Sequence, residues 1–226
     1  AKAGCDVLLH AVLETRPSER IWLDPDTVLS PASAEAGLRA AGAVVAAVEL
    51  VLHGESKRAF CAVRPPGHHA TATAAMGFCL FNSIAVGAAH ALDKFGLSRI
   101  AIADFDVHHG NGTQAIFDLE PRVVFASSHQ MPLYPDSGHV TERGVSNIFN
   151  APLQPGATGA QFREAWRTRL LPHLDAFRPQ LVMISAGFDA HRLDPLAQVQ
   201  LEAEDFDWIT RELVAIAGRH ADGRVV

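Results

Sequence analysis

Short, unbroken runs of apolar residues recur along the chain, and longer segments with helical periodicity separate them. The run from Ile100 to Ala103 is typical of a strand buried on both faces of a parallel sheet. The expected strands cover residues 60–63, 100–105, 123–127 and 181–185, and another begins at residue 224. The expected helices cover residues 3–15, 34–53, 78–95, 113–119, 158–177 and 202–220. This alternation predicts an α/β fold with a mainly parallel sheet and helices on both of its faces.

Two long segments without clear periodicity, residues 16–33 and 128–156, are expected to be loops. A loop as long as the second is usually functional or mobile when it lies inside a compact domain. No internal repeat or interdomain linker interrupts the alternation, and 226 residues suit one large α/β domain. We therefore expect residues 1–226 to form a single domain.

Polar residues that suit a metal site follow the strand expected at residues 100–105. Asp104, Asp106 and His108 come at two-residue intervals, so in an extended backbone their side chains leave the same face. Neighbours on that face lie roughly 6.5 Å apart, and zinc–ligand bonds are about 2.0–2.2 Å long. Asp106 and His108 can therefore share an ion, whereas Asp104 is better placed behind it. A competing interpretation is an acidic strand end that caps the next helix, but a cap needs only one such side chain.

Asp189 follows the strand expected at residues 181–185 and is the best third ligand. Zinc hydrolases hold the ion with three protein ligands and leave one position open. Two carboxylates and one imidazole leave the ion nearly neutral, which suits a site that must still polarise a carbonyl. An ordinary turn or helix cap is the alternative role for Asp189.

His68 and His69 follow an expected strand through the turn sequence RPPG, and they are the imidazoles available to act as a base. A carboxylate partner favours the charged form of an imidazole, whereas a neutral amide partner does not. Asp104 and Asn111 can supply one partner of each kind, so the two histidines are expected to differ chemically. Taken alone, an adjacent histidine pair is more often a surface or helix-capping feature.

Composition and charge indicate which binding partners and which cellular location to expect. The net charge of -6 argues against nucleic acid as a direct ligand. The three cysteines form neither a disulfide framework nor a CxxC metal pattern, so a cytoplasmic location is the default expectation. No apolar run of about 18 residues and no basic-then-apolar leader is visible, so no membrane association is expected. Because the first methionine is Met76, we expect the natural chain to extend beyond this sequence.

Five motifs in a fixed order resemble the histone deacetylase superfamily, and the first and third take the forms found in its class II and bacterial members. They are RPPGHHA, GFCLFNSIAVGA, DFDVHHGNGTQ, YPDSG and SAGFDAHRLDPL. The resemblance implies a three-layer arginase/deacetylase fold and a zinc-dependent amidohydrolase, similar also to acetylpolyamine amidohydrolases. The implied substrates are acetylated lysine peptides or acetylated polyamines. The resemblance leaves open whether the chain forms a homo-oligomer.

The resemblance also assigns roles to individual residues. Asp106, His108 and Asp189 match the family's zinc ligands, and His68 and His69 match its tandem catalytic histidines. Asp104 matches the acid behind the first histidine, while Asn111 replaces the acid that many members place behind the second.

The implied channel and rim for the acyl-lysine stem consist of Gly77, Phe78, Tyr134 and Leu196. Asp26 matches a rim aspartate that holds the substrate backbone, and Asp24 is the alternative. A structural K⁺ or Na⁺ site, built largely of backbone carbonyls, is implied at Asp104, Asp106, His108, Ser127 and Ser128.

One departure concerns the oxyanion donor, a Tyr or His that the family carries in a GGY-like loop after the strand that here begins at Arg224. The only tyrosine of the chain is Tyr134, which matches the channel wall. We therefore expect a domain truncated at both ends, with impaired hydrolysis by these 226 residues alone. Two alternatives stay open: a non-catalytic module that binds acyl-lysine or polyamine, and a binuclear manganese ureohydrolase of the arginase type, which would need more clustered acids.

Overall fold

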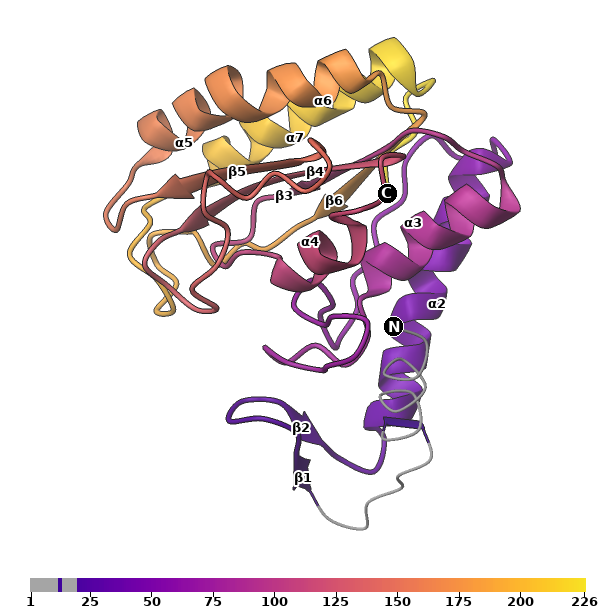
Figure 1. Ribbon diagram of the computed structural model, residues 1–226, viewed down its shortest axis with the longest axis vertical. Coiled ribbons are helices and arrows are strands. Elements are labelled where there is room, and N and C mark those ends of the chain that lie inside the picture. The colour runs from indigo at the N-terminus through magenta and orange to yellow at the C-terminus, as the bar shows by residue number, and fades with distance from the viewer. Residues whose placement is uncertain (1–11, 14–19) are drawn as a thin grey trace.

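A computed structural model describes residues 12–13 and 20–226 of the chain (Figure 1). The helix expected at residues 3–15 lies almost wholly outside the described residues. The segment expected as a loop at residues 16–33 contains a small antiparallel hairpin of β1 (Ile21–Trp22) and β2 (Val28–Leu29). Asp24 stabilises the turn between the two strands, because its Oδ1 accepts hydrogen bonds from the backbone N–H groups of Asp26 and Thr27.

The centre of the fold is a parallel sheet of four strands in the order β5-β4-β3-β6. The strands are β3 (Ile100–Asp104), β4 (Val123–Gln130), β5 (Ile148–Leu153) and β6 (Leu181–Ser185). All residues of β3 and β4 are buried, as expected for strands covered on both faces.

Helices cover both faces of this sheet (Figure 1). On one face lie α2 (Ser33–Leu52), α3 (Ser83–Lys94) and α4 (Asn111–Phe117). On the other lie α5 (Gly159–Ala165), the π-helical segment η1 (Trp166–Leu170), α6 (Leu171–Phe177) and α7 (Ala203–His220). Each face has its own buried apolar core, with Ile102 and Phe125 facing the first group and Ala103 and Val124 facing the second. The predicted three-layer α/β architecture is confirmed.

Strand β5 lies within a segment that was expected to be a loop. It pairs with β4 from Phe125↔Ile148 to Gln130↔Leu153. Asn150 and Pro152 interrupt its apolar pattern, and a proline is tolerated there because β5 is an edge strand.

The expected helix at residues 158–177 forms, but it is not regular. Leu171 N–H donates to Trp166 O, five residues back, and Pro172 has no N–H to continue the α-helical ladder. The indole Nε1–H of Trp166 donates to Ser128 Oγ at 2.9 Å, which ties the π-helical segment to β4.

The prediction of a strand at residues 60–63 is wrong. Pairing occurs earlier in the chain, at Arg58, which bridges Val225, and Val225 also bridges Val182 of β6. Phe60 is 76% exposed, and within the described part of the chain no strand lies alongside residues 60–63. The strand expected from Arg224 is represented by these isolated bridges alone.

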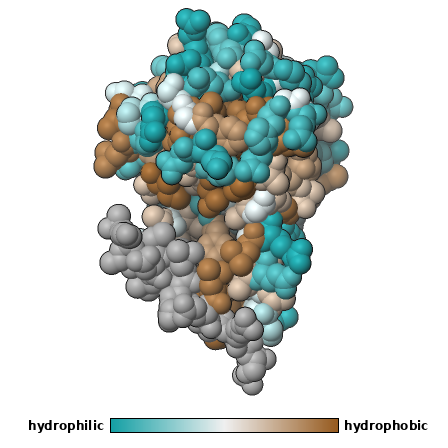
Figure 2. Space-filling model, turned by 90° about the vertical axis from the view of Figure 1, so that its right-hand side faces the viewer, coloured by the Kyte–Doolittle hydropathy of each residue, from teal (hydrophilic) through white to brown (hydrophobic). Residues whose placement is uncertain are grey.

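The face that carries α2 and α3 has hydrophobic residues in broken patches between hydrophilic ones (Figure 2). The exposed apolar side chains of these two helices include Leu38 and Leu50 of α2 and Val86 of α3. Of the helices described, none has the length and apolar character required to cross a bilayer.

Candidate metal centre and active site

Two strands that lie side by side position the metal-binding group. Asp104 pairs with Ser185 at the ends of β3 and β6, so the segments that follow both strands emerge at the same edge of the sheet. Asp106 and His108 follow β3, and Asp189 follows β6. Gly187 permits their approach, because a side chain at this position would collide with the Asp106 carboxylate.

The backbone after β3 is not extended, which differs from the geometry expected for Asp104, Asp106 and His108. Asp106 N–H donates to Asp104 Oδ1, and His108 N–H donates to Asp106 Oδ1. These two successive aspartate turns curl the chain, so local hydrogen bonds rather than strand alternation direct the side chains.

Asp106, His108 and Asp189 form a group that could hold a metal ion, with ligand atoms within 4.8 Å of one another. His108 Nδ1 lies 3.1 Å from Asp106 Oδ1 and 3.0 Å from Asp189 Oδ2. Burial lowers the pKa of His108, but the two carboxylates outweigh it and raise the pKa to about 10. One ring nitrogen facing two carboxylate oxygens is a donor set that a shared cation suits, so these residues fit a metal with three protein ligands.

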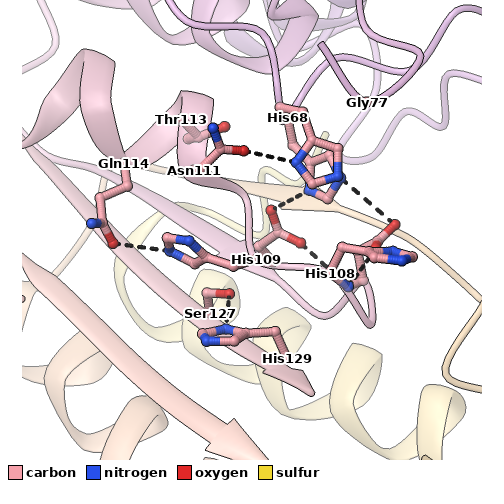
Figure 3. Close-up of polar contacts among 12 residues, drawn as sticks. His68, Gly77, His108, His109, Asn111, Thr113, Gln114, Ser127 and His129 are labelled. Atoms are coloured by element: carbon pink, nitrogen blue, oxygen red, sulfur yellow. Dashed lines mark hydrogen bonds and ion pairs between the residues drawn. The ribbon is translucent and has the colours of Figure 1, made fainter. Parts of the chain in front are cut away.

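The tandem histidines lie beside this group with their rings 4.0 Å apart, and each has a different partner (Figure 3). His68 Nδ1 lies 3.0 Å from Asp104 Oδ2, and His69 Nδ1 lies 2.8 Å from Asn111 Oδ1. Asn111 Nδ2 donates to Met76 Sδ, which leaves its Oδ1 to accept the Nδ1–H of His69. The structure thus places one carboxylate and one amide behind the pair.

The surroundings of the two rings give them different charge states. Burial opposes charge on His68, but Asp104 and Asp106 raise its pKa to about 9. Burial and the neighbouring charge of His68 lower the pKa of His69 to about 3. Near neutral pH, His68 is therefore a cation, and His69 is a neutral ring with a free lone pair on Nε2.

Several residues of the predicted channel lie around His69. A side chain at Gly77 would collide with the His69 ring, and the ring of Tyr134 lies 5.2 Å from it. Phe78 N–H donates to Thr27 Oγ1 at 3.0 Å, and Thr27 Oγ1 donates to Asp26 Oδ1 at 3.4 Å. The hairpin that carries Asp26 is thereby fixed beside Phe78.

The remaining predicted site residues have other local contacts. Leu196 is 55% exposed in a turn in which its N–H donates to Asp194 Oδ1. Ser127 Oγ bonds to His129 Nδ1, and Ser128 Oγ accepts from Trp166. The channel role of Leu196 and the cation role of the Ser127 and Ser128 carbonyls remain predictions.

Thr27 and Gly187 were not identified as site residues from the sequence. Thr27 connects two segments 51 residues apart, and Gly187 matters because of the Asp106 carboxylate far away in the chain. The only local signal for Gly187 was a glycine two residues after the end of a buried strand.

Comparisons with known proteins identify the family of the chain. Residues 6–226 match the model of the histone deacetylase domain. The chain is 44% identical over 196 residues to an uncharacterised protein of Synechocystis, covering 86% of this chain and 64% of that protein. It is 41% identical over 211 residues to a histone deacetylase-like amidohydrolase of Pseudomonas aeruginosa, covering 90% of this chain and 55% of that protein.

A solved structure, that of the HDA15 HD domain, superposes with a TM-score of 0.92 at 34% identity, covering 100% of this chain and 66% of that one. The chain thus spans 55% to 66% of the length of these three relatives. The family model covers nearly every residue, including all those of the predicted metal group and histidine pair. The chain belongs to the histone deacetylase domain family.

Proposed function

We propose that this chain is the core of a zinc-dependent amidohydrolase that removes acetyl groups from lysine side chains or acetylated polyamines. The observation that supports it most is the position of His108 Nδ1 between two carboxylates, beside one charged and one neutral histidine.

Asp106, His108 and Asp189 would hold the zinc ion. When bound, zinc polarises an amide carbonyl and lowers the pKa of a water molecule to about 7. Within the described residues, these three form the only cluster of His, Cys, Asp or Glu side chains that could hold a metal ion. The nearby Asp104 carboxylate is engaged with His68. This favours a single zinc over the binuclear manganese site of an arginase-type enzyme.

His69 is suited to act as the general base and then the general acid. Its Nδ1–H is held by Asn111, so Nε2 is free to take a proton from the attacking water and return it to the leaving amine. An amide partner leaves no negative charge behind the ring to stabilise its protonated form. We expect Asn111 mainly to orient His69, because its hydrogen bond raises the pKa of the ring less than burial and the His68 charge lower it.

His68 is suited to a mainly electrostatic role. Its positive charge is fixed by Asp104 behind the ring, 3.0 Å from Nδ1, and it would stabilise the negative charge that develops on the carbonyl oxygen. The same charge keeps His69 neutral in the resting state, which is the form that a base requires.

Phe78 and Tyr134 would line the passage for the apolar stem of the acyl-amine, with Gly77 and Leu196 beside them. Phe78 is 54% exposed and Tyr134 39% exposed, so both rings offer apolar surface to a ligand. Asp26, or Asp24 next to it, would hold a cationic or backbone group of the substrate at the rim. A K⁺ or Na⁺ ion held by carbonyls of Asp104, Asp106, His108, Ser127 and Ser128 would be structural.

The test is acetate release from an acetyl-lysine peptide and from an acetylpolyamine by the full gene product that contains this chain. Replacing the base in His69→Asn should lower kcat by about 10²- to 10⁴-fold while zinc content is retained. The matched control is His220→Asn, which removes a histidine that pairs with Asp175 away from the site. A wild-type protein that binds both ligands without hydrolysing either would instead support a binding module.

A further inference from the structure

Two buried histidines next to the metal-binding group have no part in the proposed mechanism. His109 and His129 are each 1% exposed, and their rings lie 4.7 Å apart (Figure 3). A neutral buried imidazole needs one acceptor and one donor as partners.

His129 has both partners. Its Nε2–H donates to the backbone carbonyl of Gly138 at 3.0 Å, and its Nδ1 accepts from Ser127 Oγ at 3.0 Å. Gly138 has φ +90°, and a Cβ there would lie 2.5 Å from His129 Nε2 and 2.7 Å from His109 Cδ2. The backbone of residue 138 therefore rests directly on the histidine pair, and a glycine is required for this contact.

His109 contacts the same loop at the preceding residue, Ser137. Its Nδ1 accepts from Ser137 Oγ at 2.8 Å, and its Nε2–H donates to Gln114 Oε1 at 3.0 Å. Gln114 also donates to Glu142, whose other carboxylate oxygen accepts from the backbone N–H groups of Gly138 and His139. Every one of these polar groups is engaged, so the loop is fixed to the protein at consecutive residues.

This loop carries a wall of the proposed channel. Tyr134 lies four residues before Gly138, and its ring lies 5.2 Å from His69 and 6.3 Å from His108. His109 directly follows the metal ligand His108 in the chain. The histidine pair thus joins the segment that holds the metal to the loop that holds Tyr134.

We propose that His109 and His129 form a clamp that positions Tyr134 over the site and thereby sets the width of the acyl-amine channel. They are positioning residues, because they act through the loop and touch neither the metal ligand atoms nor the substrate. The effect on substrate use rests on the proposed function, whereas the effect on the loop does not.

The experiment compares His129→Phe, His129→Gln and Gly138→Ala in the full gene product. Phenylalanine keeps a ring but loses both hydrogen bonds, while glutamine can still donate to the Gly138 carbonyl. Gly138→Ala keeps both histidines and pushes the loop away from them. If His129→Phe does not fold, Gly138→Ala provides the test instead. The control is His220→Phe, at the part-buried last residue of α7, which pairs with Asp175 of α6.

Hydrogen exchange of the amides in residues 134–142 is the first measurement, and it needs no activity. We expect faster exchange in His129→Phe and Gly138→Ala, near wild-type exchange in His129→Gln, and no change in the control. Equal exchange in His129→Phe and wild type, with both folded, would overturn the clamp whether or not the protein is a deacetylase.

Steady-state kinetics on an acetyl-lysine peptide are the second measurement. Of the two hydrogen bonds lost in His129→Phe, only the one to the Gly138 carbonyl reaches the loop. Loss of one neutral hydrogen bond corresponds to roughly a 2- to 12-fold effect, so KM should rise by about that factor, with a smaller change in kcat and unchanged zinc content. In a Tyr134→Ala background the same substitution should no longer raise KM. A KM effect that persists without the Tyr134 ring, or faster exchange with an unchanged KM, would overturn the positioning role.

Discussion

His68 and His69 are adjacent residues with the same side chain, yet their surroundings leave one ring charged and the other neutral. Asp104 stabilises the His68 cation, and that cation together with burial keeps His69 neutral. An environment that separates the pKa values of two like groups is the usual basis for assigning an acid and a base. The sequence predicted this difference from one carboxylate and one amide, which the structure places 3.0 Å and 2.8 Å from the two rings.

The buried neutral histidines make stability depend on pH. The folded-state pKa of His129 is about 3, below the ordinary value of 6.5. Below pH 6.5 the unfolded chain therefore binds a proton that the folded chain does not, and the free energy of unfolding falls as the pH is lowered towards 3. Each such group contributes a slope of about 1.4 kcal/mol per pH unit. His129→Gln removes one of them.

Urea denaturation at several pH values between 4 and 6 should therefore give a shallower pH dependence for His129→Gln than for wild type. His220→Gln, at a histidine paired with Asp175, is the reference variant. Parallel pH profiles for wild type and His129→Gln would show that His129 is protonated in the folded protein.

Other features of single residues could not be predicted from the sequence, because they depend on contacts formed only in the folded chain. The aspartate turns that direct Asp106 and His108 replace the strand geometry that the two-residue spacing predicted. Thr27 joins the hairpin to Phe78 only in the folded chain. His109 follows the ligand His108 without any local sign of its contacts with Ser137 and Gln114.

At the scale of elements, continuous apolar runs and long helical periods were predicted well, and mixed segments were not. Strands β3, β4 and β6 and helices α2 and α7 lie close to their expected ranges. Strand β5 was missed because Asn150 and Pro152 break its apolar run. The expected strand at residues 60–63 failed because the pairing partner, Val225, meets Arg58 instead. Apolar composition alone does not determine which residues pair.

Two helical glycines allow a matched test of the packing between α2, α3 and β6. A Cβ at Gly87 of α3 would lie 2.6 Å from Val44 Cγ1 and 3.0 Å from Met183 Cε, whereas a Cβ at Gly42 of α2 meets nothing within 4 Å. Gly87→Ala should lower the free energy of unfolding by about 1–3 kcal/mol through overpacking. Gly42→Ala should raise it by about 0.5–1 kcal/mol, because alanine favours the helix.

Chemical denaturation of both variants measures this difference directly. The substitution is the same and both sites are inside helices, so only the surroundings differ. A stabilised Gly87→Ala would mean that α3 does not pack against α2 and β6 as described.

On the scale of the whole molecule, the parallel sheet explains why residues far apart in sequence meet. Asp106 and Asp189 follow neighbouring parallel strands, so both lie at the carboxyl edge, where open α/β sheets form their sites. This part of the architecture could be predicted, because alternating strands and helices determine it. The position of the hairpin beside Phe78 could not, since its two-residue strands carry almost no periodic signal.

The measurement that tests the proposed function most directly is a zinc titration of the metal-free full gene product, followed by acetate release from an acetyl-lysine peptide. Hydrolysis should be absent without metal and reach its maximum at one zinc per chain. In Asp189→Asn zinc should bind weakly, because one of the three ligands has lost its charge. Asp207→Asn, at an exposed carboxylate paired with Arg211, should titrate like wild type. Hydrolysis that persists without metal, or that requires two manganese ions per chain, would contradict a zinc site formed by Asp106, His108 and Asp189.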